Sequence, residues 1–214
     1  MADKLCAFHA LLVQANARMN LTRVSDDPDE AIDRNYLDSL APLELVRGAQ
    51  SCVDVGSGAG FPGIPLSIFL PQTRFVLLEA QARRVEFLRE AICRLRLNAE
   101  AVCMRAEDAA RAPWREAFDC AVSRAVAPLR VLCELTLPLV RVGGRVVACK
   151  GPGAREEAEQ AANALALLGG ATARVLPVDI PGRDWEHTLV VLEKTSPTPD
   201  KYPRRAGIPE KRPL

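Results

Sequence analysis

The stretch that most constrains the fold is residues 52–63, with the sequence Cys-Val-Asp-Val-Gly-Ser-Gly-Ala-Gly-Phe-Pro-Gly. Its apolar start, in which Val53 and Val55 flank Asp54, predicts a buried strand that leads into a glycine turn and then a helix. Glycine permits positive φ and lets a ligand approach the backbone closely. Because the first N–H groups of a helix lack partners, such a turn can bind a polar or anionic group of a nucleotide-like cofactor. The glycines of the turn are Gly56, Gly58 and Gly60.

The spacing of these glycines disfavours NAD as the cofactor. Phe61 stands where a dinucleotide-binding fingerprint needs its third glycine. A glycine-rich turn is a weak signal on its own, and a turn with a purely structural role is the alternative.

A second apolar run strengthens the cofactor interpretation. Residues 74–79 have the pattern of a strand and end in Glu79, nineteen residues after Gly60. In a βαβ unit, an acid at the end of the second strand lies beside the first glycine turn and can accept hydrogen bonds from both ribose hydroxyls. The alternative is a solvated acid at a strand end. Together, the turn and the acid predict a nucleoside-containing cofactor.

Residues 54–66 resemble the cofactor loop of the bacterial small-subunit (16S) ribosomal RNA guanine-N7 methyltransferases, the glucose-inhibited division protein B family. The Phe-Pro-Gly-Ile-Pro run after the glycines is more specific to this family than the glycine turn that methyltransferases share in general. Further matches follow in order along nearly the whole chain, at residues 20–22, 36–40, 123–129, 150–151 and 202–214.

The resemblance implies transfer of a methyl group from S-adenosylmethionine to N7 of a specific guanosine in 16S ribosomal RNA. It places Arg124 at the site of transfer, where this side chain reaches either the methionine carboxylate or the substrate base; a surface arginine is the alternative. Glu107 is taken to contact the adenosine part, although such an acid can also simply start a helix. The residues that the resemblance assigns to the cofactor are Gly56, Gly58, Gly60, Phe61, Glu79, Ala106 (through its backbone), Glu107 and Arg124.

From residue 51 onward, strand and helix patterns alternate, which predicts parallel strands with helices on both faces. The resemblance adds the class I S-adenosylmethionine-dependent methyltransferase fold, a doubly wound, mostly parallel, seven-stranded, Rossmann-like α/β sheet whose last strand is antiparallel. The expected strands are 51–55, 74–79, 100–104, 118–122, 144–149, about 172–178 and 187–193. The expected helices are 61–70, 82–97, 129–140 and 154–168.

The N-terminal region predicts a helical addition. Residues 4–18 carry an apolar stripe at helical spacing and are expected to dock on the main domain. A second helix is expected at about 29–47, with Asp33 and Arg34 exposed. Asn35 stands where the family usually has histidine, and it is not assigned as a site. The residues of this second helix that are expected to point inward are Ile32, Tyr36, Leu40 and Leu43. The expected domain organisation is a helical cap (1–48), a methyltransferase domain (49–194) and a basic tail (195–214).

Two cationic segments are candidates for RNA contact. Lys150, in a Lys-Gly-Pro-Gly loop, faces RNA phosphates in one interpretation and is part of a plain loop in the other. Residues 200–214 carry a net charge of +3, and Tyr202 offers a stacking surface. This tail either orders on RNA or packs back on the domain. Its expected RNA-binding residues are Lys201, Arg204 and Arg205.

Composition limits the remaining classes of function. The net charge of +1 says little about partners. The seven cysteines are scattered with no C-x-x-C pair, which predicts buried, reduced, structural thiols in a reducing compartment and no metal site. The sequence shows no signal peptide and no apolar run long enough to span a membrane, so a cytoplasmic protein without membrane or DNA partners is expected.

The predicted chemistry needs no general base, because N7 of guanine carries a lone pair and no proton. The chain has two histidines, His9 and His187, and neither is expected at the active edge of the sheet. The expected partner is 16S ribosomal RNA, the small subunit or its precursor. Two alternatives stay open: a methyltransferase that acts on a small molecule or a protein, and a non-catalytic ribosome-assembly module that binds RNA.

Overall fold

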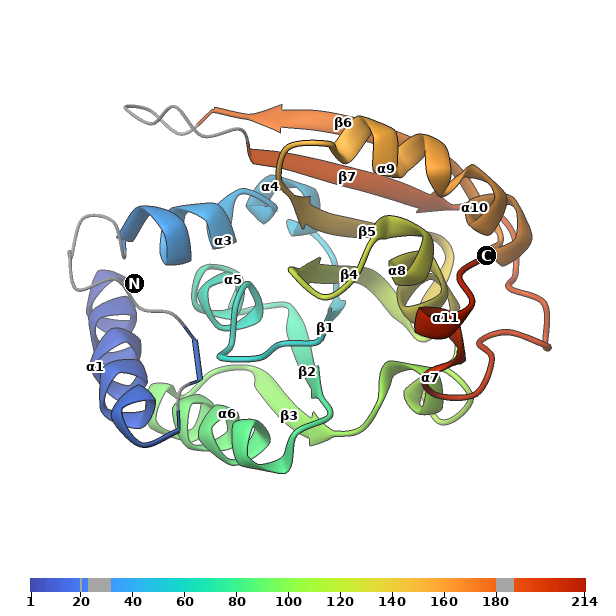
Figure 1. The fold of residues 1–214 in the computed structure, drawn as a ribbon. Helices are drawn as coiled ribbons and strands as arrows, with labels where there is room; N and C mark the ends of the chain where they lie inside the picture. Colours follow the sequence, from blue (N-terminus) through green and yellow to red (C-terminus); the bar gives the residue numbers. More distant parts are fainter. Residues whose placement is uncertain (20, 23–31, 180–186) are drawn as a thin grey trace.

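The computed structural model describes residues 1–19, 21–22, 32–179 and 187–214. Its centre is a seven-stranded sheet with the order β3-β2-β1-β4-β5-β7-β6 (Figure 1). Strands β1 to β5 pair in parallel, and β7 runs antiparallel to both β5 and β6. The predicted fold class, including the antiparallel last strand, is confirmed. The strands are β1 (Ser51–Val55), β2 (Arg74–Glu79), β3 (Ala99–Cys103), β4 (Phe118–Arg124), β5 (Val140–Lys150), β6 (Gly170–Val178) and β7 (His187–Lys194).

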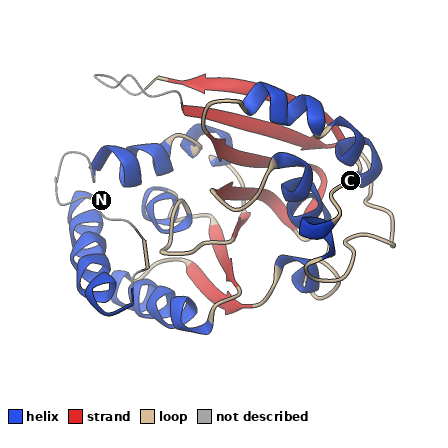
Figure 2. Ribbon diagram, viewed as in Figure 1, coloured by secondary structure: helices blue, strands red, loops and turns tan. Residues whose placement is uncertain are grey.

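Helices cover both faces of this sheet (Figure 2). Alternate residues of β1 face opposite sides: Val53 and Val55 join the cluster that contains α8 and α10 side chains, whereas Cys52 packs with Leu66 of α5. Both faces are therefore apolar, as expected for a parallel sheet buried between helices. The helices are α5 (Gly63–Phe69), α6 (Ala82–Leu95), α7 (Ala106–Ala109), α8 (Leu129–Thr136), η2 (Leu137–Leu139), α9 (Ala154–Gln160), α10 (Ala162–Leu168) and α11 (Ile208–Lys211).

Several element boundaries differ from the predictions. The helix expected at 154–168 is two helices, α9 and α10, and α5 begins at Gly63 instead of residue 61. Strand β5 begins four residues earlier than expected, because Val140 pairs with Phe118 across an irregular register. Helix α7 is absent from the expected helices, although Glu107 in its first turn agrees with the alternative that this acid starts a helix.

The N-terminal helix α1 (Ala2–Met19) docks as predicted. Phe8 and Leu12 are fully buried and pack with Ile64 of α5 and Leu88 of α6. Figure 1 shows α1 alongside α5 and α6. Within the described residues, no helix has both the length and the apolar character that a membrane span requires.

The second predicted helix is irregular. Residues 29–31 and the side chains of Asp33 and Arg34 lie outside the described part, which resumes with a π-helical turn, η1 (Ile32–Leu37), then α3 (Asp38–Leu40) and α4 (Leu43–Val46). Tyr36 is buried, but Ile32 is 49% exposed, so its predicted inward orientation is wrong. The reason is packing: Tyr36 lies against Phe8 of α1, whereas Ile32, one turn earlier at the start of η1, is not part of this cluster. Leu40 and Leu43 are half-buried.

The cysteine prediction is correct for four of the seven thiols. All seven are free. The three exposed ones lie on α1, on α6 and at the end of the edge strand β3, where one side of the element faces solvent. The buried cysteines are Cys52, Cys120, Cys133 and Cys149, and the exposed ones are Cys6, Cys93 and Cys103.

Candidate functional site

The carboxyl ends of the parallel strands bring four of the predicted cofactor residues into one pocket. The pocket has a volume of about 130 Å³ and lies beside the ends of β1, β2 and β3. Its walls include Gly56, Glu79, Ala106 and Glu107, together with Val126 from the segment after β4. Two carboxylates among apolar walls suit the adenosine part of a nucleoside-containing cofactor.

The glycine turn has the backbone geometry that its sequence predicts. Its φ angles are 73° at Gly56, 55° at Gly58 and 98° at Gly60. The Gly56 N–H donates a hydrogen bond to the Leu78 carbonyl at 2.9 Å, which ties the turn to β2. A Cβ atom on Gly56 would lie 2.5 Å from Cγ2 of Val126. A side chain at this position would therefore both strain the backbone and collide with the wall of the pocket.

Phe61 does not line the pocket. Its side chain is 4% exposed, and its ring packs edge-on against Phe8 of α1 and Tyr36 of η1, with centroid distances of 5.5 Å in both cases. Phe61 thus connects the glycine turn to the N-terminal helices. Its assigned role in cofactor binding stays a prediction, and any such role is through support of the turn.

Glu79 holds the glycine turn directly. Its side chain is 6% exposed; Oε2 accepts a hydrogen bond from the Gly58 N–H at 3.0 Å, and Oε1 accepts one from the Gln81 N–H at 2.8 Å. Arg84 Nη1 lies 3.6 Å from Oε2. A carboxylate has about four acceptor sites, so these contacts leave acceptor capacity for ribose hydroxyls.

Asp54 is a buried carboxyl whose importance the sequence analysis missed. It is 0% exposed; Oδ2 accepts a hydrogen bond from the Gly63 N–H at 3.0 Å, and Oδ1 has no hydrogen-bond partner among the described residues. Burial raises the pKa of this carboxyl to about 7. An acid within an apolar strand was the signal that could have revealed it. Asp54 fixes the start of α5 below the glycine turn.

Arg124 ends β4 and is held by the N-terminal helices. Nη1 donates to Oδ2 of Asp38 and to Oγ of Ser39, both at 3.0 Å. The guanidinium carbon lies 4.8 Å from the ring centroid of Phe61, a cation–π contact. The Asn35 carbonyl also accepts from Nη1, at 3.4 Å. Arg124 is therefore a positioned cation at the carboxyl edge of the sheet, with its side chain only 17% exposed.

His187 joins this cluster, so the expectation that neither histidine lies at the active edge is wrong. Its Nδ1 lies 2.8 Å from Oδ1 of Asp38, whose other oxygen contacts Arg124. The reason is topological: β7 runs antiparallel to β5, so the first residue of β7 lies at the edge where the parallel strands end. Asp38 thereby links an N-terminal helix to two strands of the sheet.

With this geometry in place, comparison with known proteins identifies the family. A family model, GidB, described as rRNA small subunit methyltransferase G, matches residues 1–183. The chain belongs to this family. Ribosomal RNA small subunit methyltransferase G of Pelotomaculum thermopropionicum is 45% identical over 211 residues, covering 97% of this chain and 88% of the relative. The protein of the same name from Desulfitobacterium hafniense is 44% identical over 215 residues, covering 99% and 89%.

A solved structure shares the fold of this GidB-family chain. The O-methyltransferase from Bacillus cereus in complex with SAH has a TM-score of 0.61 and 18% identity, covering 88% of this chain and 91% of that one. The predictions of the family, of an S-adenosylmethionine-dependent methyltransferase and of its cofactor are confirmed.

In this GidB-family chain, Lys150 has partners within the protein. Its Nζ donates to the Ala127 carbonyl at 2.7 Å and to Oε2 of Glu157 at 2.8 Å, and its side chain is 12% exposed. Glu157 Oε2 also accepts from the Leu129 N–H at 2.7 Å. Lys150 thus joins the loop after β4 to α8 and α9. Contact with RNA phosphates stays a prediction that these contacts do not favour.

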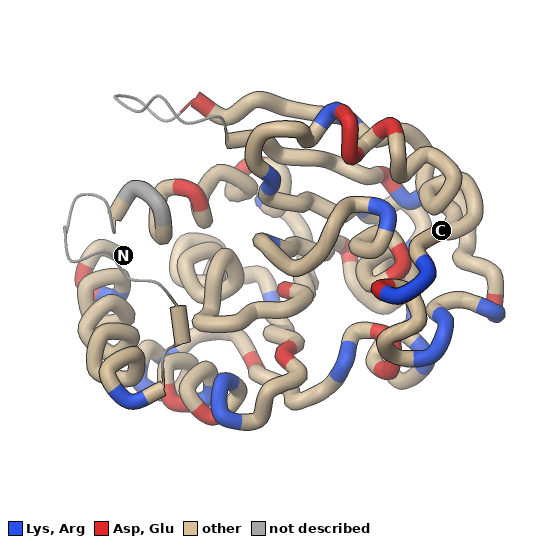
Figure 3. Tube along the Cα trace, in the orientation of Figure 1, with Lys and Arg blue, Asp and Glu red and all other residues tan. Residues whose placement is uncertain are grey.

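The basic tail packs back on the domain, which decides between the two alternatives left open by the sequence. Tyr202 is 8% exposed, so its ring offers no stacking surface. Arg204 pairs with the fully buried Glu134, whereas Lys201 and Arg205 are exposed. In Figure 3, basic residues of the tail lie beside acidic residues near α7 and α8. Of the three tail residues expected to bind RNA, Lys201 and Arg205 keep the exposure that RNA contact would need.

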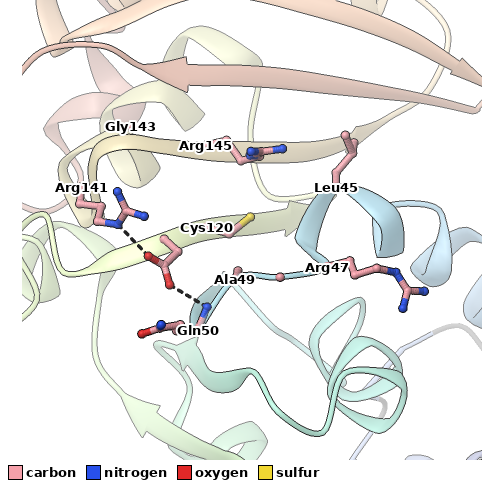
Figure 4. Close-up of a pocket in the computed structure, with 10 residues that line it drawn as sticks. Leu45, Arg47, Ala49, Gln50, Cys120, Arg141, Gly143 and Arg145 are labelled. Carbon is pink, nitrogen blue, oxygen red and sulfur yellow. Dashed lines mark hydrogen bonds and ion pairs between the residues drawn. The ribbon is translucent and has the colours of Figure 1, made fainter.

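A second pocket of the GidB-family chain lies at the opposite edge of the sheet (Figure 4). It has a volume of about 470 Å³, and Arg47, Arg141 and Arg145 are among its lining residues. Arg141 Nε pairs with Oδ1 of Asp119 at 2.7 Å, and Oδ2 of Asp119 accepts from the Gln50 N–H at 2.8 Å. Because ligands of doubly wound sheets bind at the carboxyl ends of the strands, this pocket is not the cofactor site.

Proposed function

We propose that this chain transfers the methyl group of S-adenosylmethionine to N7 of a guanosine in 16S ribosomal RNA, acting in the cytoplasm on the small subunit or its precursor. The observation that carries the proposal is the arrangement at one sheet edge: the pocket formed by Gly56, Glu79 and Glu107 lies beside Arg124, which Asp38 and Phe61 hold in place.

The pocket fits the proposed cofactor. Glu79 would accept hydrogen bonds from the ribose hydroxyls, and Glu107 with the backbone of Ala106 would contact the adenine. Met104 and Leu135 line the same pocket and provide apolar contact area. When bound, S-adenosylmethionine supplies an electrophilic methyl group on a sulfonium.

The residues of the chain contribute position rather than proton transfer. Guanine N7 has a lone pair and no proton, so a general base has no task in this reaction. Holding two reacting groups in line lowers a barrier by about 7 to 11 kcal/mol in model systems. Arg124 is suited to this role because its guanidinium presents donors in a rigid plane and is fixed by an ion pair and an aromatic ring.

The deciding experiment is transfer of labelled methyl from S-adenosylmethionine to small subunits isolated from a strain that lacks the enzyme. Chemical cleavage at N7-methylguanosine then locates the product. A single new cleavage in 16S ribosomal RNA, absent with Arg124→Ala, is expected. Labelled cofactor that binds without any methylated RNA would overturn the proposal in favour of a non-catalytic module, and label on a small molecule or protein would overturn it in favour of another substrate.

A further inference from the structure

Glu107 is in direct contact with the far end of the chain. Its Oε1 accepts a hydrogen bond from the Gly207 N–H at 2.9 Å, across 100 residues of sequence. Glu107 is 5% exposed and lines the cofactor pocket. Its Oε2 has no hydrogen-bond partner among the described residues, and this oxygen is not fully buried. The tail therefore occupies one carboxylate oxygen and leaves the other accessible.

The segment that contributes Gly207 is anchored by a buried ion pair. Nη2 of Arg204 lies 2.6 Å from Oε2 of Glu134, and the Arg204 N–H donates to Oε1 of Glu134 at 2.7 Å. The Glu134 side chain is 1% exposed. Because an unpaired buried carboxylate is strongly unfavourable, this pair fixes the path of the tail over α8. The residue after Glu134, Leu135, lines the cofactor pocket.

Two arginines shortly after α7 bind the same segment. Arg115 donates to the carbonyls of Thr198 and Tyr202 at 2.6 and 2.8 Å, and Arg111 donates to the Pro203 carbonyl at 3.3 Å. The tail is thus tied on one side to α7 and the residues after it, and on the other side to α8. Figure 1 shows it lying against these two helices. Both helices contribute walls to the cofactor pocket.

We propose that residues 202–214 are a built-in part of the cofactor site, in which Gly207 positions Glu107 toward the adenosine. This inference rests on the proposed function, because it takes Glu107 as a cofactor contact. A glutamate side chain is long and loses several rotatable states when it is held, so a fixed Oε1 presents Oε2 in one orientation before the ligand arrives. Gly207 is a positioning residue. The tail then sets affinity for the cofactor, and its neighbouring cations Lys201 and Arg205 are separate from this role.

The test compares two glycines with the same local strain. Gly207 has φ 78° and Gly48 has φ 85°, and a Cβ atom on either would meet no atom within 4 Å. Gly207→Ala and Gly48→Ala therefore strain the backbone similarly without a collision. Only Gly207→Ala displaces an N–H group that donates a hydrogen bond to Glu107. Gly48 lies at the opposite edge of the sheet, in the second pocket.

The measurements are the Kd for S-adenosylhomocysteine by calorimetry, and the KM for S-adenosylmethionine, the KM for small subunits and kcat. Gly207→Ala is expected to raise the Kd and the cofactor KM about threefold to tenfold, the usual effect of one lost hydrogen bond. The KM for small subunits and kcat should stay at wild-type values. Gly48→Ala should match the wild type in all four.

A double variant separates positioning from general destabilisation. In the Glu107→Ala background, Gly207→Ala should cause no further rise in Kd, because the group that it positions is gone. Additive effects, or a Kd for Gly207→Ala equal to that of Gly48→Ala, would overturn the inference while the proposed function stands. A rise confined to the KM for small subunits would assign the tail to RNA instead. Wild-type protein that binds no S-adenosylhomocysteine would overturn the proposed function and this inference together.

Discussion

Asp38 and Arg124 form an ion pair of 3.0 Å, although 86 residues separate them in sequence, and both side chains are largely buried. The pair joins the N-terminal helices to the end of β4, beside the cofactor pocket. Since Asp38 also contacts His187, one carboxylate orders three segments around the position where transfer is proposed.

Removal of the Asp38 charge should therefore damage catalysis more than cofactor binding. Asp38→Asn is expected to lower kcat about a hundredfold, the effect of a displacement of about 1 Å in a reacting geometry, with the Kd for S-adenosylhomocysteine nearly unchanged. Glu44→Gln is the matched control, because it breaks the exposed pair of Glu44 with Arg47. A kcat for Asp38→Asn equal to that of the control would contradict a role for the pair in positioning Arg124.

A side chain at residue 56 should weaken cofactor binding unless the opposite wall of the pocket, Val126, is made smaller. Gly56→Val places a branched group where Val126 already lies 2.5 Å from an added Cβ, so it is expected to abolish binding of S-adenosylhomocysteine. Gly56→Ala should weaken binding, and the added change Val126→Ala should recover part of the loss. Calorimetry on the three variants checks this. Gly58→Ala, whose Cβ would meet only the Gly56 carbonyl at 3.9 Å, should weaken binding less than Gly56→Ala does.

Glu79→Ala removes an acceptor from the turn as well as from the proposed ribose site. Hydrogen bonds to charged groups contribute about 1.5 to 3 kcal/mol each, so the loss is expected to weaken cofactor binding at least about a hundredfold. Glu79→Gln, which keeps one acceptor oxygen, should have a smaller effect. Titration with S-adenosylhomocysteine measures both. Wild-type affinity in both Glu79→Ala and Gly56→Val would refute the assigned pocket.

Asp54 should make the ligand-free protein less stable as pH rises. Its pKa is about 7 in the folded chain and near 3.8 when unfolded, so between these values the folded state binds more protons. The free energy of unfolding should then fall from about pH 4 to about pH 7, by up to about 4 kcal/mol from this group. Urea unfolding of wild type and Asp54→Asn at pH 5, 6.5 and 8 checks the sign. The difference between the two proteins should shift in favour of the variant as pH rises; a difference independent of pH would show that Asp54 is ionised throughout.

Thiol reactivity should divide the cysteines into two groups. Burial raises the pKa of Cys133 to about 12 and raises the pKa of Cys149 further, so these thiols are both inaccessible and protonated. Cys6, Cys93 and Cys103 are exposed and should react with Ellman's reagent in the native protein. The remaining four thiols should react only after denaturation. More than three fast-reacting thiols in the native protein would contradict the burial of Cys52, Cys120, Cys133 and Cys149.

The exposed Lys201 and Arg205 should differ from Arg204, which pairs with a buried carboxylate. If Lys201 and Arg205 contact RNA phosphates, each change to alanine lowers the slope of log affinity against log salt by about 1 and leaves cofactor binding intact. Arg204→Ala should instead destabilise the fold by about 3 to 5 kcal/mol, because it leaves the buried Glu134 carboxylate without its cation. Filter binding across a salt series and urea unfolding measure the two effects. An unchanged slope for both variants would remove Lys201 and Arg205 from the RNA interface.

The local part of this structure was available from the sequence. Apolar runs of strand length, the glycines at 56, 58 and 60, and an acid at the end of the second strand are short-range patterns, and each is fixed by backbone sterics and burial. Together with the resemblance they predicted the sheet, the turn and Glu79 beside it, because adjacency in a βαβ unit follows from topology alone.

The partners of the charged side chains were decided by the tertiary structure. From the sequence, Arg204 cannot be distinguished from any other cation of a solvated tail. Only the path of the tail over α8 brings it to Glu134. His187 meets Asp38 because an antiparallel β7 starts at the edge where the parallel strands end. Sequence determines which segments fold and which faces they bury, since periodicity is local. Which distant charges meet depends on how whole elements pack, and no short-range pattern encodes it.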